Sequence, residues 1–119
     1  MAKFGSVDEY VASLAPGHAS TMRALIATAL AVDPRLGVKL AWNVPQIHIG
    51  KDYVMGLSAA KAHLSVAPWS KDIMAQYADR LAGFDPTDNM FRVEPGWKVD
   101  VTLIRDLVRA RLAELADVA

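Results

Sequence analysis

The histidines are the side chains of this sequence best suited to hold a metal ion, and there are three of them, His18, His48 and His63. The expected sheet register places His48 opposite Val54 and His63 opposite Ala60, on flanking strands. Six residues of strand, at roughly 3.3 Å each, would separate the two rings by about 20 Å. Ligands of one ion lie within a few ångströms of each other, so we interpret His48 and His63 as separate histidines.

Carboxylates are the other candidate ligands, because hard cations such as iron and calcium prefer clustered oxygen donors. Asp85 and Asp88 share one turn-rich segment, and Asp100 precedes a predicted helix, so turn and cap roles account for them. The carboxylate pair best placed to hold a hard cation weakly is Asp8 and Glu9 in the first predicted helix. A capping box at the start of that helix already explains Glu9.

Arg111 is unusual because it falls on the apolar stripe of the last predicted helix, between Leu107 and Leu115. A buried guanidinium needs a partner. One interpretation is a cation that faces an internal pocket and holds an anionic ligand with two hydrogen bonds. The other is an arginine that extends to the surface or pairs with a structural carboxylate. Arg92 in the last predicted strand and Lys39 in the first leave the same alternatives open.

The Trp-x-x-Pro corner formed by Trp42 and Pro45 has two interpretations. A buried tryptophan supplies a large apolar area and a proline fixes the corner, so the first interpretation is a packing element. The alternative is that Trp42 and Trp69 wall a small-molecule cleft, because ligand pockets are mostly apolar with a few polar groups.

Catalytic motifs are missing from the sequence, which has no Gly-x-Ser-x-Gly elbow, no phosphate-binding glycine loop and no paired histidine motif. It contains no cysteine, which excludes disulfides, thiol nucleophiles and thiolate metal sites. Its 13 basic and 13 acidic residues balance, whereas nucleic-acid-binding modules usually carry a basic excess. These patterns favour a non-enzymatic domain with no nucleic-acid partner, and they leave enzymatic activity open.

The chain is predicted to form one domain over residues 1–119, because its length is near the common domain size and 53% of its residues are hydrophobic. The first five residues lack the apolar run and cleavage site of a signal peptide. The longest apolar-rich segment, 24–32, is too short to span a bilayer. We therefore expect a cytoplasmic protein with no membrane partner.

The spacing of apolar residues predicts an α+β domain with an antiparallel sheet of about five strands and helices packed on one face. The expected order is α-α-β-β-β-β-α-β-α. Helices are expected over 7–14, 17–32, 70–83 and 101–116, and the last strand over 90–93. Ser6, Ser70 and Asp100 are the predicted N-caps.

Two turns set the predicted register of the central strands. A three-residue turn over 50–52 and a two-residue turn over 61–62 keep one face of the sheet apolar, with Tyr53 on that face. The predicted cross-strand pairs are Ile49 with Tyr53, Ile47 with Met55, Ala59 with Leu64, and Leu57 with Val66.

Six segments spread over residues 6–115 together resemble the YdhG-like family, a bacterial domain family of largely unknown function. The segments are Val7-Asp8-Glu9-Tyr10, Trp42-x-x-Pro45, His63, Pro68, Phe91-Arg92 and Leu107-Val108-Arg109-Ala110-Arg111-Leu112. The resemblance implies a single α+β domain and a cytoplasmic location. Some members are described as intracellular iron chaperones, frataxin-like in role, so it also implies iron as a possible cargo. The chain departs from the family where aromatic side chains are common, with small residues at Gly56, Ala60 and Ala67.

These observations lead to two hypotheses of function. The first is a non-enzymatic domain that binds an unknown small molecule or protein at the sheet face away from the helices, or at an edge cleft. The second, implied by the resemblance alone, is an iron chaperone with weak carboxylate binding. No cofactor is assigned, and both a monomer and a homodimer built on a free strand edge remain open. The candidate ligand-binding residues are Trp42, His48, His63, Trp69, Arg92 and Arg111.

Overall fold

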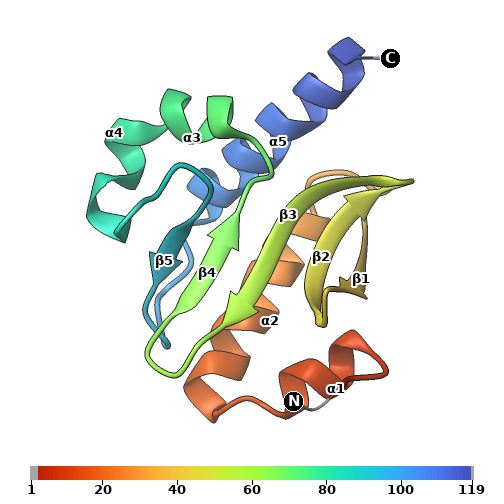
Figure 1. The fold of residues 1–119 in the computed structure, drawn as a ribbon, viewed down its shortest axis with the longest axis vertical. Coiled ribbons are helices and arrows are strands. Elements are labelled where there is room, and N and C mark those ends of the chain that lie inside the picture. The colour runs from red at the N-terminus through yellow and green to blue at the C-terminus, as the bar shows by residue number, and fades with distance from the viewer. Residues whose placement is uncertain (1–2, 119) are drawn as a thin grey trace.

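One five-stranded antiparallel sheet forms the centre of the molecule, in a computed structural model that describes residues 3–118 (Figure 1). The ends of the predicted domain, residues 1 and 119, lie outside the described residues. Each strand pairs with its neighbour in the sequence, so the sheet is a meander, and the predicted antiparallel α+β fold is confirmed. The strands are β1 (Gly37–Ala41), β2 (Val44–Ile49), β3 (Asp52–Ala59), β4 (Leu64–Ala67) and β5 (Phe91–Val93).

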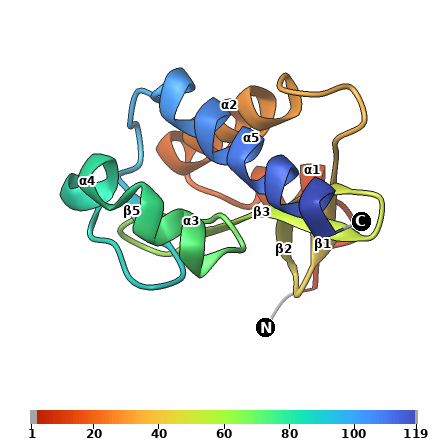
Figure 2. The same cartoon turned by 90° about the horizontal axis from the view of Figure 1, so that it is seen from above.

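The long helices cover one face of this sheet and leave the opposite face of β2 and β3 open (Figure 2). Helices α2 (Pro16–Leu30) and α5 (Val101–Val118) pack against each other, and α5 also contacts β3. Helix α1 (Val7–Ala12) packs against α2 and against β1 and β2. No helix of the described part of the chain is long and apolar enough to cross a membrane.

The predicted helix starts are confirmed, whereas the third helix differs from the prediction. Ser6, Ser70 and Asp100 each accept a hydrogen bond from the backbone N–H three residues further on. The single helix expected up to residue 83 is divided at Tyr77, whose φ of −100° and ψ of 14° are not helical. The pieces are α3 (Lys71–Gln76), α4 (Ala78–Leu81) and the short 3₁₀ helix η1 (Ala82–Phe84). With this break in place, Leu81 is fully buried.

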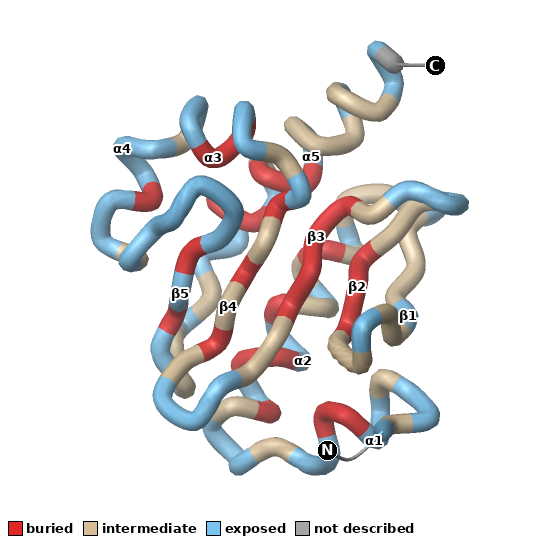
Figure 3. Tube along the Cα trace, viewed as in Figure 1, coloured by how far each residue is buried: buried red, intermediate tan, exposed pale blue. Residues whose placement is uncertain are grey.

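The core lies between the covered sheet face and the helices, as the buried positions in Figure 3 show. Alternate residues of β4 and β5 are buried in it, whereas β3 is buried over the four consecutive residues 54–57 that follow Tyr53. Helices α2 and α5 each contribute one apolar stripe. Its largest fully buried side chains include Met22, Leu25, Ile47, Met55, Leu57, Leu64, Phe91, Ile104 and Leu107.

The register between β2 and β3 is partly as predicted. Ile47 pairs with Met55 as expected, but Ile49 pairs with Asp52 and not with Tyr53. The turn has two residues, with Gly50 at a φ of 55°, and a β-bulge in β3 absorbs the extra residue. Tyr53 therefore lies opposite His48, on the open face, and the predicted pairing of His48 with Val54 is wrong. The predicted pairs between β3 and β4 are confirmed.

Candidate functional site

Trp42 projects from the tight turn between β1 and β2, and 68% of its surface is exposed. Trp42 and Asn43 both have positive φ, 53° and 62°, which is the conformation of a two-residue type I′ turn. Such turns favour asparagine and glycine, and a tryptophan there is unusual. The interpretation of Trp42 as a buried packing element is therefore wrong, because the turn directs the ring outward.

Trp69 follows β4 and is also held at a positive φ, 60°, with 40% of its surface exposed. Its indole Nε1–H donates a hydrogen bond of 2.9 Å to Oε1 of Gln46, a residue of β2 that is 4% exposed. A Cβ added at Gly56 would lie 2.8 Å from the same oxygen. The room expected above Gly56 is thus occupied by the Gln46 carboxamide, which positions the Trp69 ring.

Three rings meet over the open face, and we call Trp42, Tyr53 and Trp69 the aromatic surface. Tyr53 stacks on Trp69 with ring centroids 5.2 Å apart and planes inclined by 23°. Trp42 lies 5.2 Å from Tyr53 and 5.5 Å from Trp69, between centroids. The Lys39 ammonium lies 5.6 Å from the Tyr53 centroid, within reach of a cation–π interaction. The arrangement presents an exposed indole with one cation beside it.

The aromatic surface continues into a small hollow beside Trp69, of about 380 Å³. Ala67 and the exposed Met90 both line this hollow. The small side chain of Ala67 was expected to leave room above the sheet, and the hollow lies beside it. The remaining lining residues are Ser70, Lys71 and Asn89.

Arg111 does not face an internal pocket, which corrects the first of its two interpretations. Its Nε donates to the backbone carbonyl of Tyr53 at 3.0 Å, and its Nη1 lies 3.2 Å from Oε1 of Glu114. The other carboxylate oxygen of Glu114 accepts from the Ser70 hydroxyl at 2.6 Å. Arg111 thereby ties α5 to β3 behind the aromatic surface, and it also lines a shallow hollow of about 390 Å³ with Trp69.

The other three candidate residues are distributed around the sheet. His48 lies opposite Tyr53 at the edge of the aromatic surface, and its Nδ1 is 3.1 Å from the Gly50 carbonyl oxygen. His63 lies in the β3–β4 connection and not on a strand, which corrects the prediction for this residue. Arg92 of β5 pairs with Asp85, with 3.4 Å between nitrogen and oxygen. The structure thus brings Trp42, Trp69 and His48 to Tyr53, and ties Arg92 into a surface ion pair.

Metal-ligating side chains are not gathered in the described part of the chain, where no group of three histidine or acidic residues is placed to hold an ion. The carboxylate of Glu9 accepts a hydrogen bond from the backbone N–H of Gly5, so it serves as a cap. A large pKa shift occurs away from these candidate ligands, at Asp33 in the α2–β1 loop. There, hydrogen bonds from Arg35 lower the pKa of Asp33 from 3.8 to about 2.

Sequence reasoning missed Tyr53 and Gln46. The three-residue turn predicted over 50–52 places Tyr53 on the buried face, whereas Gly50-Lys51 is also suited to the two-residue turn that the structure has. No sequence signal links Gln46 to Trp69, because the bond depends on the empty position at Gly56 on the neighbouring strand.

Together, the fold and site define a small α+β domain with a five-stranded meander and an exposed aromatic surface. No family model matches the chain. A curated protein of Bacillus subtilis, "Intracellular iron chaperone frataxin", is 30% identical over 112 residues, which cover 92% of this chain and 90% of that protein.

Solved structures give the same result. A Bacillus subtilis protein described as a member of the DUF1801 family, YdhG, aligns with a TM-score of 0.83 and 29% identity over 92% of this chain and 90% of that one. An uncharacterized conserved protein from Lactobacillus casei aligns with a TM-score of 0.61 and 25% identity over 97% and 96% of the two chains. The chain belongs to the YdhG-like DUF1801 family, as its sequence segments predicted.

Proposed function

We propose that this chain is a non-enzymatic binding domain whose ligand contacts the aromatic surface on the open sheet face. The observation that carries the proposal is the exposure of Trp42, at 68%, in a turn conformation that disfavours tryptophan. Backbone strain and an exposed large ring both reduce stability or solubility, so a ring kept there is best explained by a contact outside the domain.

The chemistry of the aromatic surface favours a flat ligand group. An exposed indole face offers stacking to a planar ring, and such contacts contribute about 0.5–1.5 kcal/mol beyond their buried area. Lys39 beside Tyr53 adds one positive charge at the rim. The matching ligand is a planar heteroaromatic compound or side chain that carries a negative charge, with the hollow at Ala67 taking an apolar substituent.

Two-dimensional NMR of the indole N–H signals tests this proposal, because the chain contains its own reference. Trp42 and Trp69 belong to the aromatic surface, whereas Trp97 is half-buried against Phe84, with centroids 5.4 Å apart. A panel of planar heteroaromatic carboxylates is expected to shift the first two signals and leave the third in place. The proposal fails if no compound shifts any indole signal, or if the Trp97 signal moves as much as the others.

Matched variants test whether the effect of the panel depends on the aromatic surface. Trp42→Asn removes the exposed ring and suits the turn, so the panel is expected to lose its effect on Trp69. Val101→Asn replaces another exposed apolar side chain, at the start of α5, and is expected to leave binding unchanged. If both variants lose binding of the panel to the same extent, binding is not specific to the aromatic surface and the proposal is contradicted.

A second candidate function is iron handling, and it is supported by the name of the Bacillus subtilis relative, an intracellular iron chaperone. The acidic residues of α1 would supply weak carboxylate ligands, with Asp8 available and Glu9 engaged as a cap. Titration with ferrous iron in the absence of oxygen is expected to release heat and to broaden the Asp8 signals. Asp8→Asn should weaken binding, while Asp79→Asn on α4 should not. Absence of heat and of broadening would remove this candidate.

A further inference from the structure

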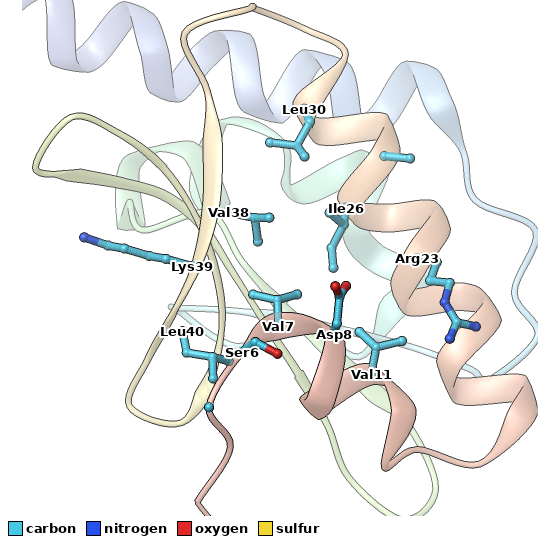
Figure 4. Close-up of a pocket in the computed structure, with 12 residues that line it drawn as sticks. Ser6, Val7, Asp8, Val11, Arg23, Ile26, Leu30, Val38, Lys39 and Leu40 are labelled. Carbon is cyan, nitrogen blue, oxygen red and sulfur yellow. The ribbon is translucent and has the colours of Figure 1, made fainter.

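A groove of about 880 Å³ lies between α1, α2 and β1, behind the free edge of the sheet (Figure 4). It is separate from the aromatic surface, which lies on the open face. Most of its apolar side chains are only half-buried, so they retain surface that an occupant would cover. The apolar lining residues are Val7, Val11, Ile26, Ala27, Leu30, Val38 and Leu40.

Within residues 3–118, no strand pairs with the outer edge of β1, which lies beside this groove. β1 is the first strand in the sheet order, with β2 as its neighbour. Because the β1–β2 turn has two residues, Ala41 and Val44 form a hydrogen-bonded pair. Hydrogen-bonded and non-hydrogen-bonded pairs alternate along an antiparallel ladder, so the N–H and C=O groups of Val38 and Leu40 point away from β2. Pro45, which has no N–H, lies opposite Leu40, in agreement with this pattern.

One acidic and two basic residues, Asp8, Arg23 and Lys39, belong to the lining of the otherwise apolar groove. Asp8 of α1 lines it, and Figure 4 shows the carboxylate beside Ile26. Asp8 makes no ion pair with Arg23, which also lines the groove, or with any other residue in the described range 3–118. Lys39 reaches the opposite face, near Tyr53, and does not cover the groove. A cationic group in the occupant would therefore be complementary to Asp8.

We propose that β1 and this groove bind an extended segment of a partner protein, which adds a sixth strand beside β1. Outward N–H and C=O groups spaced two residues apart are satisfied by another extended backbone. Alternate side chains of that segment would enter the groove, and a lysine or arginine among them would face Asp8. The occupant is thus an alternating, apolar segment with one basic residue.

A second copy of this chain is a poorer occupant in the register centred on Lys39. Antiparallel pairing of two β1 strands about Lys39 would place the two Lys39 side chains directly opposite each other. Like charges in that position destabilise a strand pair. A basic partner segment that meets Asp8 from the groove side avoids this repulsion.

The experiment titrates the nitrogen-15-labelled chain with a capped eight-residue peptide that alternates valine and threonine and has one central lysine in place of a valine. Binding is expected to slow amide exchange of Val38 and Leu40 at least tenfold. The same peptide with glutamate in place of lysine should bind at least threefold more weakly. The Asp8→Asn variant should remove that difference between the two peptides.

Two variants on α2 test whether the peptide occupies the groove. Ala27→Arg puts a long side chain on the groove wall and is expected to abolish binding, whereas Ala24→Arg changes an exposed position outside the groove and should not. Trp42→Asn should also leave the peptide bound, which separates this site from the proposed function. The proposal is overturned if Val38 and Leu40 show no protection, if the two arginine variants behave alike, or if hexylamine binds as well as the peptide. A dimer in light scattering whose Val38 and Leu40 amides are already protected without peptide would overturn it too.

Discussion

Replacing Trp42 with asparagine separates what this residue contributes to stability from what it contributes to binding. About a third of the ring is buried, because 68% is exposed. A third of a tryptophan's roughly 250 Å², at about 25 cal/mol per Å², amounts to about 2 kcal/mol lost on removal of the ring. Asparagine tolerates the positive φ of 53° at this position, which recovers about 1 kcal/mol.

The expected result is a loss of about 1 kcal/mol in the free energy of unfolding, measured by urea denaturation followed by circular dichroism. Trp42→Ala removes the same ring but keeps a side chain that is disfavoured at positive φ, so it should cost about 2 kcal/mol. The difference between the two variants isolates the backbone strain at Trp42.

Two outcomes would refute this reasoning. If Trp42→Asn lowers the free energy of unfolding by more than about 3 kcal/mol, the ring is a structural element and its exposure has no functional meaning. If the asparagine and alanine variants are equally stable, the turn conformation imposes no strain on Trp42. In either case the main support for the binding proposal is lost.

Three further predictions concern packing and charge. Gly56→Ala should cost at least about 1 kcal/mol, because the new Cβ would lie 2.8 Å from the Gln46 carboxamide oxygen, and thermal unfolding measures the loss. Arg111→Ala should cost about 1.5–3 kcal/mol in urea denaturation by removing hydrogen bonds made by a charged group, and Arg111→Lys should recover part of it. An NMR titration should give Asp33 a pKa of about 2, and Arg35→Ala should return it toward 3.8.

The sign of the last effect follows from linkage. Because the folded pKa of Asp33 is depressed, its ion pair stabilises the fold fully above the unfolded pKa near 3.8, and this stability is lost as the pH falls through about 2. A folded pKa of 3.8 in the wild type would contradict the Asp33–Arg35 pair. An Arg111→Lys variant as stable as the wild type would contradict the guanidinium contacts, and an unchanged Gly56→Ala variant would contradict the close approach of Gln46.

The fold was predictable where local signals and the apolar pattern agree. Ser70 and Asp100 were recognised as caps because a polar residue precedes an apolar helical stripe, and the structure gives both the expected backbone hydrogen bond. Ile47 was paired correctly with Met55 although the turn between them was not. The requirement that both side chains enter the core outweighs the turn length, and a bulge absorbs the difference.

The candidate site was predictable only in part, because it depends on backbone details that composition does not reveal. Trp42 and Trp69 were named together, but a tryptophan in sequence is as readily buried as exposed. Its direction follows from the positive φ of the turn. Tyr53 reaches the open face only through the bulge, and Arg111 leaves the apolar stripe to bond the backbone of β3.

The most direct test of the proposed binding surface is a crystal structure of the chain soaked with the heteroaromatic carboxylate that shifts the indole signals most. The account predicts the planar group stacked on the exposed face of Trp42, with its carboxylate near Lys39. A compound bound elsewhere in an otherwise unchanged molecule, with the Trp42 ring free, would contradict it.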